Sequence, residues 1–297
     1  MGFDWIFAGE LAINGALSGL MYSLIGLGIV LIYKSSAVPN LAQGALAMLG
    51  AYIVLAFFDG AGIPMWAAIP LGMVVMFGVG TGIERFTLRR MAGQPIVMIL
   101  MLTLGLDIFF HAVTLTLWGG TNRSLSYGIP DDAVEVAGML IDFTYLAGGI
   151  IALILVAFFT YFFKTRKGIV LRAISDDPVA SWSVGISVEN GVGLSWAMSA
   201  VVAAVTGVVF GAIQGVDYTL ALLLLKGIAV AVLGGLDSVL GAVVAGVLLG
   251  VLEGMASGFL DPLVGGGSKD LVVAGAIILT IIVRPHGLFG REDIERV

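Results

Sequence analysis

Long apolar runs separated by short polar stretches dominate this sequence. A helix that crosses a bilayer needs about 20 mainly apolar residues. The first half contains five such runs, at residues 11–33, 41–58, 66–83, 96–118 and 145–163. The second half adds runs at residues 193–214, 239–255 and 271–283, and a short run at 220–234 that Lys226 interrupts. The pattern predicts an all-α polytopic membrane protein with about eight full transmembrane helices and one short or re-entrant segment.

Composition places the whole chain in the membrane. Of its 297 residues, 59% are hydrophobic and 11% are charged, whereas about a quarter of the residues of a soluble domain are charged. We therefore expect residues 1–297 to form a single transmembrane domain. The longest polar stretch, residues 164–191, has the pattern of a short amphipathic helix, with Leu171, Ile174, Val179 and Trp182 among charged residues. It is too small for an enzyme but large enough to dock another protein.

Basic residues in alternate loops predict the orientation, because Lys and Arg in short loops stay in the cytoplasm. The basic residues that decide it are Lys34, Arg85, Arg89, Arg90, Lys164, Arg166, Lys167 and Arg172. The N-terminus is then outside, and the acidic loop at 119–143, with Asp131, Asp132, Glu135 and Asp142, is external. The C-terminal tail, with Arg284, Arg291 and Arg296, is cytoplasmic if residues 220–234 cross the membrane. If that segment is re-entrant, one end must lie on the other side.

Several classes of chemistry are excluded. The chain has no cysteine, and its two histidines, His111 and His286, lie far apart in sequence, so thiol, disulfide and zinc chemistry have no residues to work with. Residues 265–270 lack the spacing of a phosphate-binding loop, so the chain does not hydrolyse ATP by itself. The basic residues form no long run that would bind nucleic acid. Asp4 and Glu10 precede the first apolar run, which does not fit a cleaved signal peptide.

Ionisable residues inside the predicted spans are functional candidates, because a charge in hydrocarbon is costly. Asp107 and His111 lie four residues apart on one helix face, as either a structural ion pair or part of a polar pathway. Lys226 either presents its charge near the membrane midplane from a broken helix or extends to the interface. Glu253 lies near the end of a span, and we expect it to face water or lipid headgroups.

Residues 39–44 (PNLAQG) interrupt the chain between the first two spans. Asn40 suits a helix N-cap, and the free backbone N–H groups of such a helix start could face a solute carboxylate; the alternative is an ordinary cytoplasmic helix start. We take Asn40, Gln43 and Gly44, with Asp107 and Lys226, as candidate residues of a solute pathway.

Glycines at four-residue spacing line one face of two predicted helices. They are Gly207, Gly211 and Gly215, and then Gly246, Gly250 and Gly254. Because small residues let transmembrane backbones approach closely, we interpret both sets as helix-packing stripes. A role in gating, through sliding of the packed helices, is the alternative.

Several stretches, in this order along the chain, resemble the LivH-type permeases of bacterial branched-chain amino acid ABC importers. They are residues 39–44 followed by 48–52 (MLGAY), residues 83–85 (IER) followed by 103–106 (TLGL), residues 168–173 (GIVLRA), residues 232–236 (VLGGL) and residues 284–290 (RPHGLFG). Together they extend over nearly the whole chain. Two features depart from the family pattern: Asp107 and His111 occupy a span that is usually uncharged, and residues 237–239 (DSV) replace a common Gly-Ser-Ile-Pro.

The resemblance implies a bacterial inner-membrane permease that works by alternating access, driven by ATP and Mg bound in partner subunits. The partners would be a second related permease subunit, two cytoplasmic ATPase subunits and an external solute-binding protein. The resemblance also implies that residues 164–191 contact the ATPase. The coupling residues in that segment would be Gly168, Leu171, Arg172, Ala173, Asp176, Asp177, Ala180 and Gly185.

Three alternatives to this function remain open at this point. A homologous importer permease for urea or short amides would share most of these motifs. A proton-coupled carrier would need no ATPase, and residues 164–191 would then be dispensable. A membrane-embedded enzyme would need a cluster of polar catalytic groups at one depth, for which Asp107 and His111 are the one candidate pair.

Overall fold

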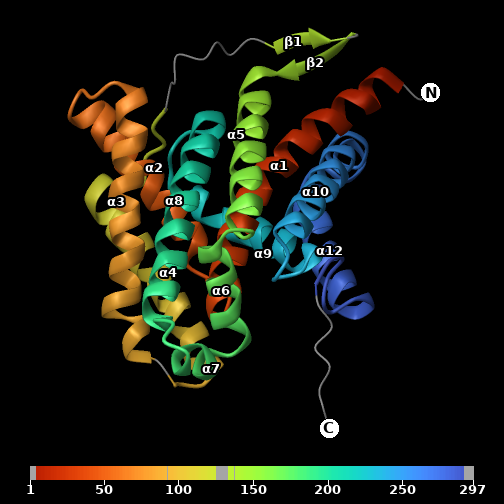
Figure 1. Ribbon diagram of the computed structural model, residues 1–297. Coiled ribbons are helices and arrows are strands. Elements are labelled where there is room, and N and C mark those ends of the chain that lie inside the picture. The colour runs from red at the N-terminus through yellow and green to blue at the C-terminus, as the bar shows by residue number, and fades with distance from the viewer. Residues whose placement is uncertain (1–4, 92, 125–132, 137, 291–297) are drawn as a thin grey trace. The chain divides into compact units, whose positions relative to one another are not determined.

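The computed structural model describes residues 5–91, 93–124, 133–136 and 138–290 (Figure 1). Asp4, Asp131, Asp132, Arg291 and Arg296, which entered the predictions of topology, lie outside these residues. The chain divides into two compact units. Unit 1 comprises Met1–Gly26, Gly128–Ala157 and Leu225–Val297, and unit 2 comprises Leu27–Tyr127 and Phe158–Leu224.

Seven helices among the described residues are long and apolar enough to cross a membrane, which confirms an all-α polytopic membrane protein. Five are α1 (Trp5–Ser36), α3 (Met65–Phe86), α4 (Ile96–Trp118), α5 (Phe143–Phe162) and α8 (Val188–Gln214). The others are α10 (Val239–Phe259) and α2 (Gln43–Leu55), which a π-helical turn, η1 (Ala56–Gly60), extends. Prolines and glycines set several of their ends: Pro64 and Pro95 precede α3 and α4, and Gly119 and Gly215, both with positive φ, follow α4 and α8.

The remaining helices are shorter. They are η2 (Leu88–Met91), α6 (Arg166–Asp176), α7 (Pro178–Ser183), η3 (Tyr218–Leu222), α9 (Leu223–Gly234), α11 (Asp261–Val264) and α12 (Ser268–Val283). The predicted short segment at 220–234 corresponds to η3 and α9, which form one short apolar helical stretch. The predicted last span is α12, whose 16 residues extend about 24 Å, less than the roughly 30 Å of a hydrocarbon core.

A short β-hairpin precedes α5 in the loop that we predict to be external. Strands β1 (Ala133–Val136) and β2 (Met139–Asp142) pair antiparallel, with Ala133 opposite Asp142 and Val136 opposite Met139. Gly138 lies in the turn with a φ of 80°, a conformation that glycine adopts without steric cost. The sequence pattern predicted only a loop here.

Unit 2 is built around α2 and α8. Almost every residue of α2 is buried, and α8 packs against both α2 and α3 (Figure 1). Tyr52 of α2 and Trp196 of α8 are among the largest fully buried side chains. Small residues bring the backbones close: a methyl group added at Gly207 would overlap the Ala47 carbonyl oxygen. Close backbone packing of this kind is how transmembrane helices associate without a hydrophobic driving force.

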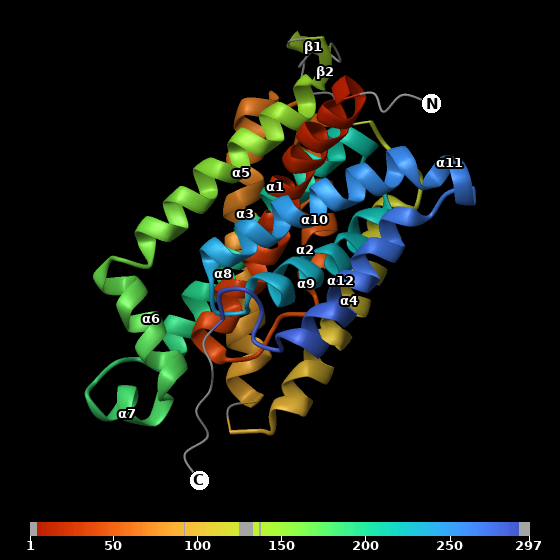
Figure 2. The ribbon, with the colours of Figure 1, turned by 90° about the vertical axis from the view of Figure 1, so that its right-hand side faces the viewer.

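Unit 1 contains a similar contact between the first half of α1 and α10 (Figure 2). A methyl group at Gly250 would overlap the Gly15 carbonyl oxygen, and one at Gly246 would overlap the Ser23 hydroxyl. Helix α12 also packs against α10. The sequence predicts a single transmembrane domain for residues 1–297. This remains a prediction, since the chain divides into two compact units.

Candidate functional site

A buried ion pair lies inside unit 1. The Lys226 ammonium of α9 donates hydrogen bonds to both Glu253 carboxylate oxygens, each at 2.8 Å, and to the Tyr22 hydroxyl at 3.3 Å. The same ammonium lies 4.7 Å from the centre of the Tyr22 ring, in cation–π geometry. Glu253 is only 3% exposed. The Lys226 ammonium is therefore paired with a carboxylate of the protein and does not extend to the membrane–water interface.

The expectation that Glu253 faces water or headgroups is wrong. Its position in α10 directs it at Lys226, 27 residues earlier in the chain, and the local sequence does not reveal that partner. A carboxylate in an apolar helix is tolerated when a cation compensates its charge.

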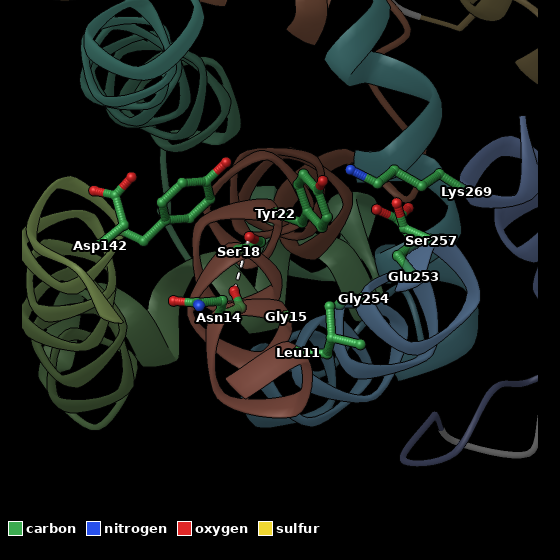
Figure 3. Close-up of a pocket in the computed structure, with 12 residues that line it drawn as sticks. Leu11, Asn14, Gly15, Ser18, Tyr22, Asp142, Glu253, Gly254, Ser257 and Lys269 are labelled. Atoms are coloured by element: carbon green, nitrogen blue, oxygen red, sulfur yellow. Dashed lines mark hydrogen bonds between the residues drawn. The ribbon is translucent and has the colours of Figure 1, made fainter. Parts of the chain in front are cut away.

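A polar pocket of about 290 Å³ adjoins this ion pair (Figure 3). Its wall comes from α1, α10, the end of β2, the start of α5 and the start of α12. The lining residues are Leu11, Asn14, Gly15, Ser18, Tyr22, Asp142, Tyr145, Gly250, Glu253, Gly254, Ser257 and Lys269. The volume is near the lower end of the range of ligand pockets, about 300–1,000 Å³, so it suits a small solute.

Three polar residues of α1 contribute to the pocket because they are spaced four apart. Asn14, Ser18 and Tyr22 share one helix face, and the Ser18 hydroxyl donates to the Asn14 carbonyl oxygen at 2.9 Å. The Asn14 side-chain amide donates to the Leu140 carbonyl oxygen at 3.0 Å, while its Oδ1 atom is buried without a hydrogen-bond partner. Sequence analysis missed these residues, although their four-residue spacing in an apolar helix is a signal that could have found them.

The glycines of α10 also shape the pocket. Gly250 and Gly254 lie against the α1 backbone, and a methyl group at Gly254 would come within 2.6 Å of the Leu11 carbonyl oxygen. Because these positions carry no side chain, the backbones of α1 and α10 approach closely beside the pocket. The packing stripe predicted at Gly246, Gly250 and Gly254 therefore lies beside the pocket in unit 1.

The predicted pathway residues Asn40, Gln43 and Gly44 lie in unit 2. The Asn40 amide donates to Gln43 Oε1 at 3.0 Å, Gln43 Nε2 donates to the Ser199 carbonyl oxygen at 3.2 Å, and the Ser199 hydroxyl donates to Gln43 Oε1 at 2.9 Å. Both amide side chains are fully buried, and Gly44 lies against the Ala221 carbonyl oxygen. This network ties α2 to α8.

Asp107 and His111 of α4 are partly buried. Neither takes part in the ion pairs formed within the described residues, which are Arg89–Glu84 and Lys226–Glu253. The Asp107 Oδ1 atom is buried without a hydrogen-bond partner. The structural ion pair that we considered for Asp107 and His111 is therefore absent among the residues that the structure describes.

Of the three glycines predicted to form a packing stripe in α8, two lie within the helix and the third ends it. Gly207 packs on α2, and Gly211 is buried. Gly215 instead ends α8 with a φ of 85°, where a methyl group would overlap the Asn122 side chain. A glycine is thus required at position 215, both by the turn and by the close approach of Asn122.

The segment predicted to contact a partner forms α6 and α7 in unit 2 (Figure 2). The Thr165 hydroxyl caps α6 by accepting a hydrogen bond from the Gly168 amide, and the Asp177 carboxylate caps α7 by accepting one from the Ala180 amide at 2.9 Å. Leu171 and Ile174 are buried, and both face Gly191 of α8. The segment is therefore mounted on a long helix through an apolar contact.

The predicted coupling residues have different environments in this segment. Gly168 and Leu171 are buried, Ala173 is half-buried, and the Arg172 guanidinium donates to the Phe163 carbonyl oxygen at 2.9 Å, beyond the end of α5. Asp176, Asp177, Ala180 and Gly185 are exposed. The apolar residues that sequence analysis named in this segment separate into two groups. Leu171 and Ile174 are buried, whereas Val179 is 77% exposed and Trp182 is 66% exposed, beside the exposed Val184.

A second polar pocket in unit 2, of about 360 Å³, lies between α3 and the start of α8. Glu84 is buried there and accepts hydrogen bonds from Arg89 at 3.1 and 3.2 Å. Gly193 of α8 leaves room for the Glu84 carboxylate. Sequence analysis noted Glu84 in the motif at residues 83–85 and Arg89 among the basic residues of the following loop, but did not pair them.

Comparison with known proteins gives one consistent result. The profile of a family described as "Branched-chain amino acid transport system / permease component" matches residues 11–282. The high-affinity branched-chain amino acid transport system permease protein BraD of Pseudomonas aeruginosa is 28% identical over 300 residues, 96% of each chain. The corresponding protein LivH of Escherichia coli is also 28% identical, over 306 residues and 96% of each chain.

Two further matches extend the comparison. A probable branched-chain amino acid transport permease protein LivH of Methanocaldococcus jannaschii is 28% identical over 289 residues, 90% of this chain and 88% of that protein. The solved structure of PsaBC from Streptococcus pneumoniae in complex with a Fab covers 95% of this chain and 94% of its own, at 16% identity and a TM-score of 0.47. That likeness is too weak to inform fold or function.

Proposed function

Because the chain belongs to the family of permease components of branched-chain amino acid transport systems, we propose that it forms half of the translocation pathway of an ATP-driven importer for branched-chain amino acids. The observation that carries this proposal is the match over residues 11–282, which includes most of α1 and all the other long helices. Relatives from three organisms are named for the same transport process.

The surface of α6 and α7 supports a cytoplasmic ATPase as partner. Val179, Trp182 and Val184 expose apolar side chains beside the Asp176 and Asp177 carboxylates. A protein interface typically combines an aromatic anchor with a polar rim. Because Leu171 and Ile174 fix this segment to α8 at Gly191, a push on α7 would be transmitted to a long helix. ATP and Mg would bind in the ATPase subunits.

The complete importer would contain a second related permease subunit, two ATPase subunits and an external solute-binding protein. The basic residues around Arg85 and Arg166 favour a cytoplasmic side for the loops after α3 and α5. In a bacterial inner membrane, the N-terminus of the chain would then face the outside and the C-terminus would face the cytoplasm. Helices η3 and α9 would together make one crossing.

Affinity purification of the tagged chain from its own membranes, in mild detergent, tests this function. We expect a second permease and ATPase subunits to co-purify, and the ATPase activity to rise when a leucine-loaded binding protein is added. A binding protein without ligand is the control. A chain that purifies alone and transports solute without ATP would contradict the proposal and favour a proton-coupled carrier.

A further inference from the structure

We propose that the polar pocket of unit 1 binds the solute itself, as a zwitterionic α-amino acid. In this site the ammonium lies near Asn14 and Asp142, the carboxylate lies near Lys269, and the aliphatic side chain lies on the glycine wall of α10. The inference rests on the proposed function, because it assigns a binding site to the solute of that importer.

The charges that line the pocket have the arrangement that a zwitterion needs. In Figure 3, Asp142 and Asn14 lie on one side of Tyr22, and Lys269 and Glu253 lie on the other. Lys226 neutralises Glu253 by contacting both of its oxygens. Lys269 takes part in neither ion pair found among the described residues. Lys269 also lies within electrostatic range of the Asp261 carboxylate. The lining of the pocket itself presents the Asp142 carboxylate on one side and the Lys269 ammonium on the other.

An unused hydrogen-bond acceptor marks the ammonium end. Asn14 Oδ1 is buried and has no partner in the described part of the chain. A buried acceptor without a donor is unfavourable, and nearly all such atoms in proteins are satisfied by protein, water or ligand. The ammonium of an amino acid supplies three donors, enough for Asn14 Oδ1 and the Asp142 carboxylate together. Asp142 Oδ1 already accepts from the Thr144 amide at 2.8 Å, which holds the carboxylate in place.

The apolar part of the pocket fits a short hydrocarbon chain. Leu11, Gly15, Gly250 and Gly254 line it without a charged group. A volume of about 290 Å³ accommodates a small amino acid. A neutral amide or urea would use neither Asp142 nor Lys269 as a charge partner, so the pocket chemistry favours a zwitterion over those solutes.

The absence of cysteine in the natural sequence gives a direct test. In the complete complex, Ser18→Cys gives this chain a single thiol, on the pocket wall, and alkylation is measured on this chain after the subunits are separated. Among the described residues, the Ser18 hydroxyl bonds within its own helix. We expect L-leucine at millimolar concentration to slow alkylation of this thiol at least threefold. Two analogues, 4-methylpentanoate without the ammonium and 3-methylbutylamine without the carboxylate, should not protect. The control is Gly60→Cys at the exposed end of η1, where no atom lies within 4 Å of an added Cβ and leucine should have no effect.

Second substitutions in the Ser18→Cys background identify the charge partner. Lys269→Gln should abolish protection by leucine, measured against the alkylation rate of the same variant without leucine, and Lys269→Arg should restore protection. Unchanged protection in the Lys269→Gln variant, or equal protection by all three compounds, would overturn the assignment.

Leucine uptake, measured on the same complexes, separates the two proposals. A complex that imports leucine but shows no protection at position 18 would overturn this site and leave the importer function standing. Protection by leucine in a chain that lacks ATPase partners would support the site and contradict the importer.

Discussion

At the scale of single residues, charge compensation decides what the membrane tolerates. Lys226 and Glu253 are both inside apolar helices, yet their charged groups meet at 2.8 Å and share the Tyr22 hydroxyl and ring. Glu253 is nearly inaccessible, while a fifth of the Lys226 side chain is exposed. Each charge is therefore acceptable only while the other is present, since a lone charge inside the protein keeps its desolvation penalty without the attraction.

Removing one member of this pair should cost more stability than removing both. We expect Glu253→Gln to lower the free energy of unfolding by about 3 kcal/mol, because it leaves the Lys226 ammonium without its carboxylate. The double variant Lys226→Met with Glu253→Leu should be close to the natural protein, because two apolar side chains replace two compensated charges. Thermal unfolding of the purified complex in detergent measures both. A Glu253→Gln complex as stable as the natural protein would contradict this account.

At the scale of elements, the long helices follow from the apolar runs, but their contacts follow from individual small residues. The structure brings Gly15 and Gly19 of α1 against Gly250 and Gly246 of α10. The α10 glycines were predicted from their spacing, whereas the α1 partners were not. A stripe on one helix does not specify which other helix will face it, because transmembrane helices lack a hydrophobic driving force that selects neighbours.

A methyl group at this contact should separate the two helices. Gly250→Ala would overlap the Gly15 carbonyl oxygen, and we expect a loss of about 1–3 kcal/mol, as for other overpacked interiors. Gly275→Ala in α12 is the matched control, because no neighbouring atom lies within 4 Å of the added methyl. The yield and melting temperature of the complex are the measurements. Equal values for the two variants would show that close approach of α1 and α10 is unimportant.

At the scale of the whole molecule, sequence alone predicts the architecture better than the site. The seven longest helices and the amphipathic segment at 164–191 can be inferred from apolar patterns, because burial in lipid imposes the same requirement on every residue of a span. The hairpin before α5 and the burial of Glu253 could not. Tyr22 and Lys226 are 204 residues apart, so no local pattern contains their contact. Only Asn14, Ser18 and Tyr22, at four-residue spacing, carried a local sign of the pocket.

The coupling between ATP hydrolysis and transport should depend on α7 more than on Arg172. Arg172 donates to the Phe163 carbonyl oxygen, so replacing it changes the end of α5 as well as the surface. Trp182 projects outward from α7, and truncating an aromatic interface anchor typically costs about 2 kcal/mol or more, roughly a thirtyfold loss of affinity.

We therefore expect Trp182→Ala to leave the chain as stable as before but to reduce recovery of the ATPase subunits and leucine-stimulated ATP hydrolysis at least tenfold. Ser183→Ala, at the neighbouring exposed position, is the control and should retain both. Because Leu171 and Ile174 hold α6 on α8 independently of Trp182, a fold defect would not explain a loss confined to coupling. Full ATPase recovery and stimulation in the Trp182→Ala complex would mean that the partner docks on another surface of the chain.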